Sequence, residues 1–249
     1  MSDGIYVALS GAIARSEQLD TVANNLANAD TTAYQPRRTS FRSVLATTPP
    51  RGDLPPLPAG EIRTVPVDRF HALARVGEGR FRQGTLQQTG AELDLALEGD
   101  GYFVLATPVG LRYTRDGHFQ RDGSGYLAAP DGARLLGRRG PIRLPGRTVQ
   151  VSVDGQVVVD GRTVDRLRLV RFPAGAGLVR EGTNRFRCSQ GGVPSPVRVR
   201  QGMLEQAAVS AVGELITLID IQRSFDALQE AIRAYRDMDG QLNYVGRPG

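Results

Sequence analysis

The chain has 249 residues, of which 40% are hydrophobic, and a formal net charge of +5 at pH 7, so it can hold one large or two modest domains with an apolar core. It contains no lysine, which excludes a Schiff-base lysine and the lysine of a phosphate-binding loop. Its one cysteine, Cys188, excludes an internal disulfide, and with two histidines it cannot build a thiolate zinc cage.

The positive charge is confined to the middle of the chain. Residues 1–35 and residues 203–249 each carry about −3, so the middle carries about +11. A basic middle suits a nucleic acid, an anionic surface or an acidic neighbour. Its arginines are scattered over predicted strands, without the aromatic interleaving or basic helix typical of nucleic-acid binding. We therefore predict solvated strand faces and no nucleic-acid partner.

An apolar stripe at helical spacing runs from the start of the chain to about residue 28, and Ser2 or Asp3 can cap its first turn. Short polar residues at 29–32 end the pattern, because their side chains compete for backbone hydrogen bonds. We predict an amphipathic helix here, with a stripe made of Ile5, Leu9, Ile13, Leu19, Val22 and Leu26. The sequence shows no signal segment and no apolar run that could span a membrane, so we expect neither signal cleavage nor membrane insertion.

Three asparagines, Asn24, Asn25 and Asn28, lie near the end of this predicted helix, where helix propensity disfavours them. Two interpretations remain open. Their side chains cap the helix end, or their amides set the register between packed helices, as a buried asparagine does in coiled coils.

A proline-rich stretch at 47–60 predicts an extended connector over residues 46–75. It contains an Arg-Gly-Asp tripeptide at 51–53 and two prolines, Pro55 and Pro58, at the spacing of SH3 ligands. Both strings are short and common in proline-rich linkers, so they indicate neither adhesion nor SH3 binding.

Between residues 76 and 202 the hydrophobic period changes to two, which predicts a central antiparallel β-domain of many short strands. Alternation is clearest in three groups: Leu93, Leu95 and Leu97; Val149, Val151 and Val153; Leu167 and Leu169 between Arg166, Arg168 and Arg171. Asp-Gly pairs punctuate the region, and both residue types tolerate the positive φ of tight hairpin turns.

The helical period returns after Gly202 and lasts to about Leu242. A helix from 206 to 242 would be about 55 Å long and needs packing partners along its length. Its stripe consists of Val212, Leu215, Ile219, Phe225, Leu228, Ile232, Tyr235 and Leu242. The two terminal helices must bury their stripes against each other, against other copies, or both. The predicted fold class is α+β: a discontinuous helical, coiled-coil domain from both termini and a central antiparallel all-β domain.

No residue pattern indicates catalysis, a metal site or a cofactor. Neither His71 nor His118 accompanies a Gly-x-Ser-x-Gly elbow. Asp94 and Glu98 share a strand face opposite the leucines, so we expect both in solvent rather than as an acid–base pair. The loop at Asp122 lacks the glutamate of a calcium site, and Cys188 has no candidate base beside it, so we expect a small half-buried side chain there.

Five motifs, in the same order, resemble the flagellar basal-body rod and hook family. The first is the Ala-Asn-Asn-Leu-Ala-Asn-Ala-Asp-Thr-Thr-Ala-Tyr run, and the last is the Gln-Arg-aromatic core of the terminal helix. They occupy residues 23–34, 93–103, 113–119, 131–137 and 221–225. The resemblance implies a structural, non-enzymatic subunit of the bacterial flagellar rod, the shaft that transmits torque. It implies assembly with copies of itself and other rod proteins, and export to the periplasmic space through the flagellar type III apparatus.

The resemblance also implies a division of the chain. Residues 1–45 would give the N-terminal helix of the rod-core helical domain and residues 203–249 its long C-terminal helix. Residues 46–75 would be the connector and residues 76–202 the β-domain. We expect the subunit interface to contain Ile5, Leu9, Ile13, Leu19, Val22, Asn24, Asn25, Leu26, Asn28, Val212, Leu215, Ile219, Gln222, Arg223, Phe225, Leu228, Ile232 and Tyr235.

Chain length leaves the proximal-rod and the distal-rod branches of the family, and residues 4–11 look more like the proximal branch. The chain departs from the family at two places. Ala33 stands where the family usually has glycine, and residues 206–209 lack its Ser-Asn-Val. These changes predict a different chain reversal at residue 33 and a different cap on the last helix.

Two other classes remain as alternatives. A periplasmic hydrolase with a helical oligomerisation stem would need a catalytic constellation, which the sequence does not show. A secreted binding module would use the basic β-domain, and surface exposure without a flagellar defect on deletion would favour it.

Overall fold

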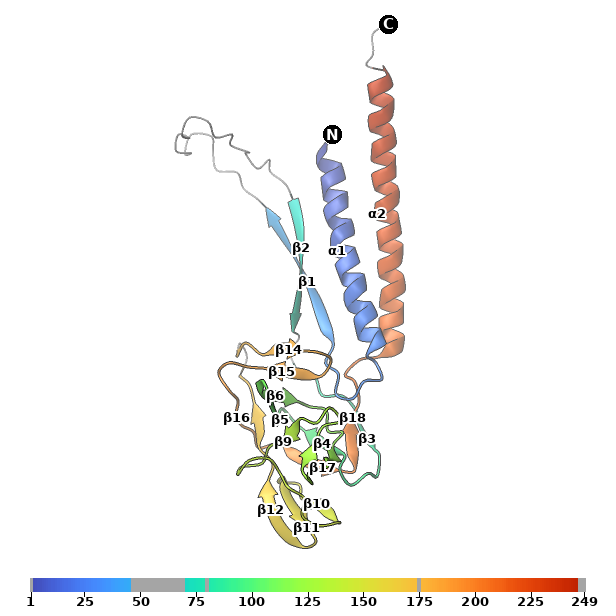
Figure 1. The fold of residues 1–249 in the computed structure, drawn as a ribbon. Helices are drawn as coiled ribbons and strands as arrows, with labels where there is room; N and C mark the ends of the chain where they lie inside the picture. The colour runs from blue at the N-terminus through green and yellow to red at the C-terminus, as the bar shows by residue number, and fades with distance from the viewer. Residues whose placement is uncertain (1, 46–69, 79–80, 174–175, 246–249) are drawn as a thin grey trace, which may run out of the picture. The chain divides into compact units, whose positions relative to one another are not determined.

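The computed structural model describes residues 2–45, 70–78, 81–173 and 176–245 (Figure 1). These residues fall into two compact units. The first unit contains both helices and a two-stranded ribbon, and the second contains residues 27–36 and the remaining strands. Residues 46–69, with the Arg-Gly-Asp tripeptide and the proline-rich stretch, lie outside the described residues.

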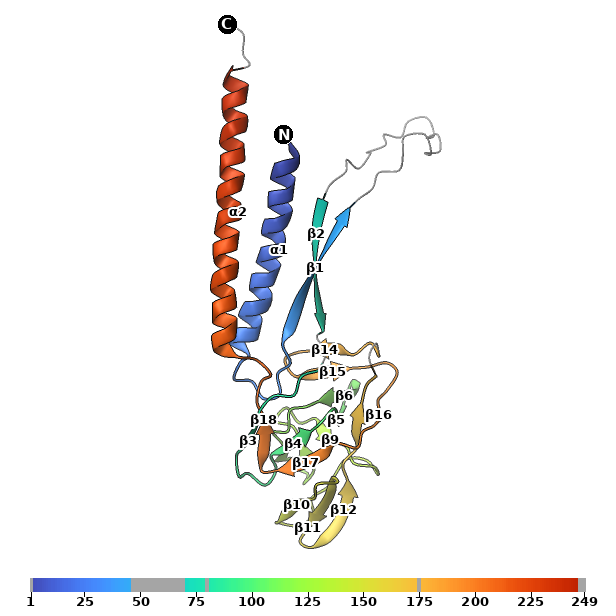
Figure 2. The same ribbon diagram turned by 180° about the vertical axis from the view of Figure 1, so that it is seen from behind.

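Two antiparallel helices, α1 (Ser2–Ala27) and α2 (Ala211–Val245), run side by side in the first unit (Figures 1 and 2). Both helices follow the predicted apolar stripes, although α2 begins five residues later than the pattern suggested. The same unit contains an antiparallel ribbon of β1 (Arg37–Leu45) and β2 (Phe70–Glu78). The sequence did not predict this ribbon, because the arginines of β1 hide any period-two pattern.

The second unit is built of short, antiparallel strands, as the alternation and the Asp-Gly pairs predicted. The largest sheet has the order β14-β15-β6-β5-β9-β8-β7, and β13 joins β5 to β16. Three smaller sheets are β10-β11-β12, β17-β4 and β18-β3. The strands are β3 (Leu86–Gln88), β4 (Leu95–Glu98), β5 (Tyr102–Thr107), β6 (Gly110–Thr114), β7 (Gln120–Arg121), β8 (Leu127–Ala128), β9 (Arg134–Leu135), β10 (Val149–Val151), β11 (Gln156–Val159), β12 (Arg162–Arg166), β13 (Leu169–Arg171), β14 (Val179–Glu181), β15 (Arg185–Arg187), β16 (Val193–Pro194), β17 (Arg198–Gln201) and β18 (Met203–Glu205).

Strand β5 lies at the centre of the second unit, because both of its faces are buried. Phe103 and Leu105 belong to the larger apolar cluster, and Tyr102 and Val104 belong to a smaller one on the other face. Edge-to-face ring contacts hold the smaller cluster, with the Tyr102 ring centroid 5.6 Å from that of Phe186.

The period-two alternation predicts side-chain burial correctly at some positions and wrongly at two. Leu167 and Leu169 are buried, and Arg168 between them is exposed, as predicted. Asp94, expected in solvent, is buried, because it precedes β4 and forms an isolated bridge with His118 instead of lying on a solvated face of that strand. Its carboxylate lies 3.0 Å from His118 Nδ1 and accepts a 2.7 Å hydrogen bond from the Thr89 hydroxyl. Val153, expected in the core, is exposed because β10 ends at Val151.

Two of the Asp-Gly pairs show why glycine is needed, each for a different reason. Asp160 and Gly161 both have positive φ, 48° and 78°, which fits the tight turn between β11 and β12. Gly117 is required by space instead, because an added Cβ would lie 1.5 Å from the carbonyl oxygen of Leu95.

A buried ion pair links distant strands of the second unit. The side chains of Arg115 and Glu205 are both fully buried, and the guanidinium donates to the carboxylate at 2.7 Å. Arg115 also donates to the carbonyl oxygens of Leu97, Gly99 and Gly101. All buried side-chain nitrogens and oxygens in the described part of the chain have hydrogen-bond partners. Burial raises the pKa of Glu205, and the Arg115 guanidinium opposes this rise.

Replacing the arginine of this pair tests its contribution to folding. Arg115→Met should lower the free energy of unfolding by about 3–5 kcal/mol, because it leaves Glu205 buried and charged without a partner. Adding Glu205→Gln should restore part of the loss, because the second change removes that charge. Urea denaturation measures both variants.

The charge on Glu205 also determines how the stability of the Arg115→Met variant depends on pH. Without Arg115 only the hydrogen bond from the Gly84 N–H opposes the burial that raises the pKa of Glu205, so the native state holds a proton that the unfolded state releases. The destabilisation should be smallest below the ordinary carboxyl pKa and grow as the pH rises. A loss that is independent of pH, with no recovery in the double variant, would contradict a charge effect.

Candidate assembly surface

One face of α2 lies against α1. Gly11 is the contact point, because a Cβ added there would lie 3.6 Å from a methyl group of Leu228. Ile221 is buried, and the half-buried residues of the same face are Leu218, Phe225, Leu228 and Ile232. Their alternating spacings of three and four residues follow one side of a helix.

A second apolar face of α2 is exposed in the single chain. Val212, Leu215, Ile216 and Ile219 follow the spacing i, i+3, i+4, i+7, and Val212 is 68% exposed. This set is called the outer stripe below. Exposed apolar patches of this kind mark interaction sites on soluble proteins. On α1, Leu9 and Ile13 are exposed as well.

Asn25 has a role that neither interpretation of the asparagines included. Its side-chain amide is buried and forms two hydrogen bonds with the backbone of Arg37, one to the carbonyl at 3.0 Å and one from the N–H at 2.9 Å. Thr39 Oγ1 donates to Thr21 Oγ1 at 2.9 Å beside it. The end of α1 is therefore tied to the first residues of β1. Asn28 accepts a 3.3 Å hydrogen bond from the Thr31 hydroxyl, as a local cap would.

The chain reversal after α1 is made by a residue in the left-handed region. Ala33 has φ 55°, a conformation that favours glycine, and it is buried. Its N–H donates to the carbonyl oxygen of Glu205 at 2.8 Å, and the N–H of Ala208 donates to the carbonyl oxygen of Tyr34 at 3.0 Å. Ala33 thus adopts at this reversal a backbone conformation that favours glycine.

Two of the side chains considered for catalysis, His118 and Cys188, can be placed, whereas the side chain of His71 lies outside the described part of the structure. His118 is half exposed and pairs with Asp94, and Cys188 is half-buried as predicted, with Sγ 3.1 Å from the carbonyl oxygen of Ala176. Within the described ranges, no three acidic, histidine or cysteine side chains group as metal ligands. Neither of the two described helices has the length and apolar character that a membrane crossing requires.

The structure separates the expected interface residues into two groups. Leu9, Ile13, Asn24, Val212, Leu215, Ile219, Gln222, Arg223 and Tyr235 are exposed; Leu19, Val22, Asn25, Leu26, Asn28, Phe225, Leu228 and Ile232 are buried or half-buried. Ile5 lies in α1. The sequence missed Leu218 and Ile221, which face inward, and Ile216 and Met238, which are exposed. Ile221 fits the helical spacing of the inward face, so counting that spacing along the sequence would have identified it.

Three family models match the chain in sequence order. The model of the flagella basal body rod protein matches residues 5–35, that of the flagellar hook protein FlgE/F/G D1 domain matches 96–159, and that of the flagellar basal body rod FlgEFG protein C-terminal region matches 200–244. The chain is 31% identical to the flagellar basal-body rod protein FlgG of Borreliella burgdorferi, over 99% of this chain and all of that protein. The chain belongs to the flagellar basal-body rod protein family.

Relatives carry two names within this family. The chain is 33% identical to the rod protein FlgF of Caulobacter vibrioides over 92% of this chain and 91% of that protein. It is 28% identical to FlgG of Bacillus subtilis over 93% and 94%. The chain is thus a structural subunit of the flagellar basal-body rod, as the five motifs predicted.

The contact between Gly11 and Leu228 allows a graded test of helix pairing. Gly11→Ala should stabilise the helical unit by about 1 kcal/mol, because alanine favours the helix and its Cβ fits at ordinary contact distance. Gly11→Leu should destabilise it, because the longer side chain must displace Leu228. Thermal unfolding followed by circular dichroism at 222 nm measures both. Equal effects of the two substitutions would show that the helices do not pack at this point.

Proposed function

We propose that the terminal helices of several copies pack around a common axis as a coiled-coil core, and that the outer stripe of α2 is buried between copies. The exposed outer stripe is the observation that carries this proposal. A single chain covers the inward face of α2 with α1 but leaves the outer stripe in water. Burying a Leu or Ile side chain contributes about 1.5–3 kcal/mol, so a neighbour that covers the stripe gains several kcal/mol.

The mechanical role follows from the same surfaces. Torque along a shaft tends to slide one subunit past the next, and sliding exposes apolar surface at a cost of about 25 cal/mol per Å². A heterologous contact repeated around an axis forms an open tube when the rotation between copies does not close into a ring. We assign residues 1–45 and 203–249 to the helical core of the rod, 46–75 to the connector and 76–202 to the β-domain. Residues 27–36 and 203–211 depart from this division because they belong to the second compact unit, and β2 (Phe70–Glu78) departs from it because it belongs to the first.

The proposal also covers the export, the location and the lack of catalytic activity of the subunit. The subunit is exported through the flagellar type III apparatus without cleavage, lies in the part of the rod that crosses the periplasmic space, and has no catalytic activity. Residues 4–11 favour the proximal branch over the distal branch.

Charge placed in the outer stripe should block assembly without unfolding the chain. Leu215→Asp with Ile219→Asp should abolish swimming in soft agar, because the interface would then bury two carboxylates. Thr217→Asp is the matched control, since it is exposed on another side of the same helix. Normal swimming of the double variant would contradict the proposal, and so would an equal loss in the control.

A deletion strain tests the position of the subunit along the rod. Basal bodies from a strain without this protein should stop within the proximal rod and lack the distal rod as well, because distal subunits would have nothing to add to. Electron microscopy of purified basal bodies measures the length of the remaining shaft. A shaft that is missing only its distal part would assign the chain to the distal branch instead.

A further inference from the structure

The surface of the second unit contains a basic groove with an apolar floor. The cavity has a volume of about 1030 Å³ and is lined by Arg138 and by parts of residues 152–154, 166–170 and 192–198. Its apolar floor consists of Val153, Leu167, Leu169, Val170, Pro194, Pro196 and Val197.

The lining of this groove contains four arginines and one acidic residue. Arg166 is engaged with Asp154, with its Nε 2.9 Å from the Asp154 carbonyl oxygen and its Nη2 3.5 Å from the carboxylate. The side chains of Arg138, Arg168 and Arg198 form no hydrogen bond or ion pair with any residue that the structure describes. All three are exposed. A concave surface lined by unpaired cations attracts an anionic partner.

The lining favours a polypeptide over a glycan or a nucleic acid. None of the described lining residues is aromatic. Sugar rings and bases are usually held by stacking on aromatic side chains, which this groove cannot provide. An apolar floor beside separate cations suits an amphipathic segment that presents apolar and acidic side chains on one face.

The outer face of α2 has this composition. It begins with the outer stripe, and farther along the same face lie Asp220, Asp226 and Glu230, together with Arg223. The three acids are exposed, and no ion pair to another described residue engages their carboxylates. From the first residue of the stripe to Glu230, the face is about 27 Å long.

We propose that the basic groove of one copy receives the outer face of α2 of a second copy. The apolar floor covers part of the outer stripe, and the unpaired arginines meet the unpaired acids. The two surfaces differ, so the contact is heterologous and leaves each copy able to bind a further copy. This inference rests on the proposed function, because it names the surface that covers the outer stripe.

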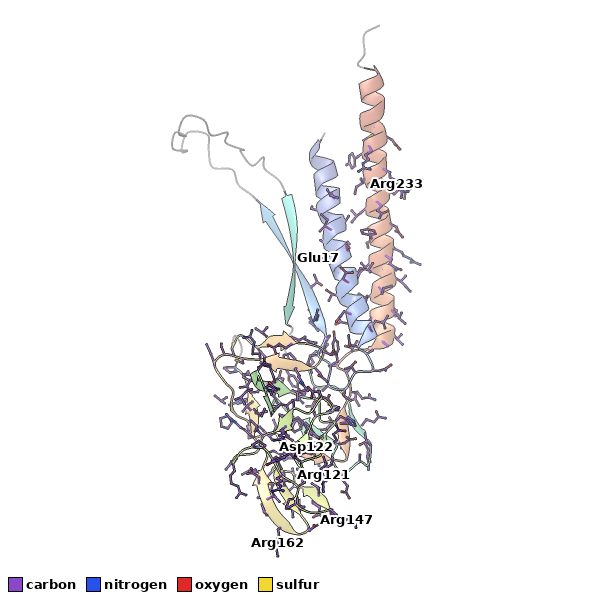
Figure 3. All side chains as sticks on the ribbon, viewed as in Figure 1. Glu17, Arg121, Asp122, Arg147, Arg162 and Arg233 are labelled. Atoms are coloured by element: carbon purple, nitrogen blue, oxygen red, sulfur yellow. The ribbon has the colours of Figure 1, made fainter. Side chains whose placement is uncertain are left out.

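Charge reversal on the full-length chain tests the contact. Arg168→Glu with Arg198→Glu should weaken association between copies at least tenfold at low salt, measured by sedimentation velocity, because like charges then face each other. The matched control is Arg147→Glu with Arg162→Glu, which makes the same charge change at exposed arginines outside the groove (Figure 3). The control should change association less than twofold, and circular dichroism checks that each variant is folded.

The reciprocal variant makes the test specific to the partner surface. Asp226→Arg with Glu230→Arg should also weaken association, and mixing it with the groove variant should restore binding between the two. Association unaffected by the groove variant, or no recovery in the mixture, would overturn the inference. Binding of purified peptidoglycan that is lost only in the groove variant, with association unchanged, would overturn it too and assign the groove to the cell wall.

The outer-stripe variant separates this inference from the proposed function. If Leu215→Asp with Ile219→Asp abolishes association while the groove variant does not, the stripe is an interface and the groove is not its partner. If the stripe variant also leaves association intact, the proposed function itself fails.

Discussion

The buried pair of Arg115 and Glu205 is the interaction on which the β-domain depends. Arg115 draws together the carbonyl oxygens of Leu97, Gly99 and Gly101, and the Glu205 carboxylate accepts the N–H of Gly84. The backbone oxygen of Glu205 accepts from Ala33. Glu205 therefore joins these stretches of chain through both its carboxylate and its backbone oxygen.

The fold class was predictable because its signals are local. Helical stripes identified both helices, and alternation with Asp-Gly turns identified an antiparallel β-domain. Alternation failed at Asp94, which precedes the strand and is buried through an isolated bridge with His118, so the rule that opposite faces of a strand differ does not apply there. The β1–β2 ribbon was missed because its pairing joins residues far apart in sequence, and no local pattern reports that pairing.

The assembly surface was only partly predictable. The stripes located the helices that carry it, but a stripe does not say which of its residues meet a partner within the same chain. The contact between Gly11 and Leu228 shows which side of α2 faces α1 within the chain, and the outer stripe lies on the opposite side. The burial of Arg115 was equally unpredictable from the sequence. Arg115 was one of the arginines expected in solvent, and only the fold brings Glu205 next to it. The spacing of a motif can locate such a residue but cannot say what it contacts.

The contact at Gly11 also fixes how far the two helices overlap. In an antiparallel pair with Gly11 opposite Leu228, the first residue of α1 lies level with about residue 237 of α2. The last turns of α2, up to Val245, therefore project beyond α1 by about 12 Å. The free end of the helical unit is a step rather than a flat surface. Units with stepped ends cannot meet flush; they overlap lengthwise, which spreads a twisting load over two levels of the shaft instead of one plane.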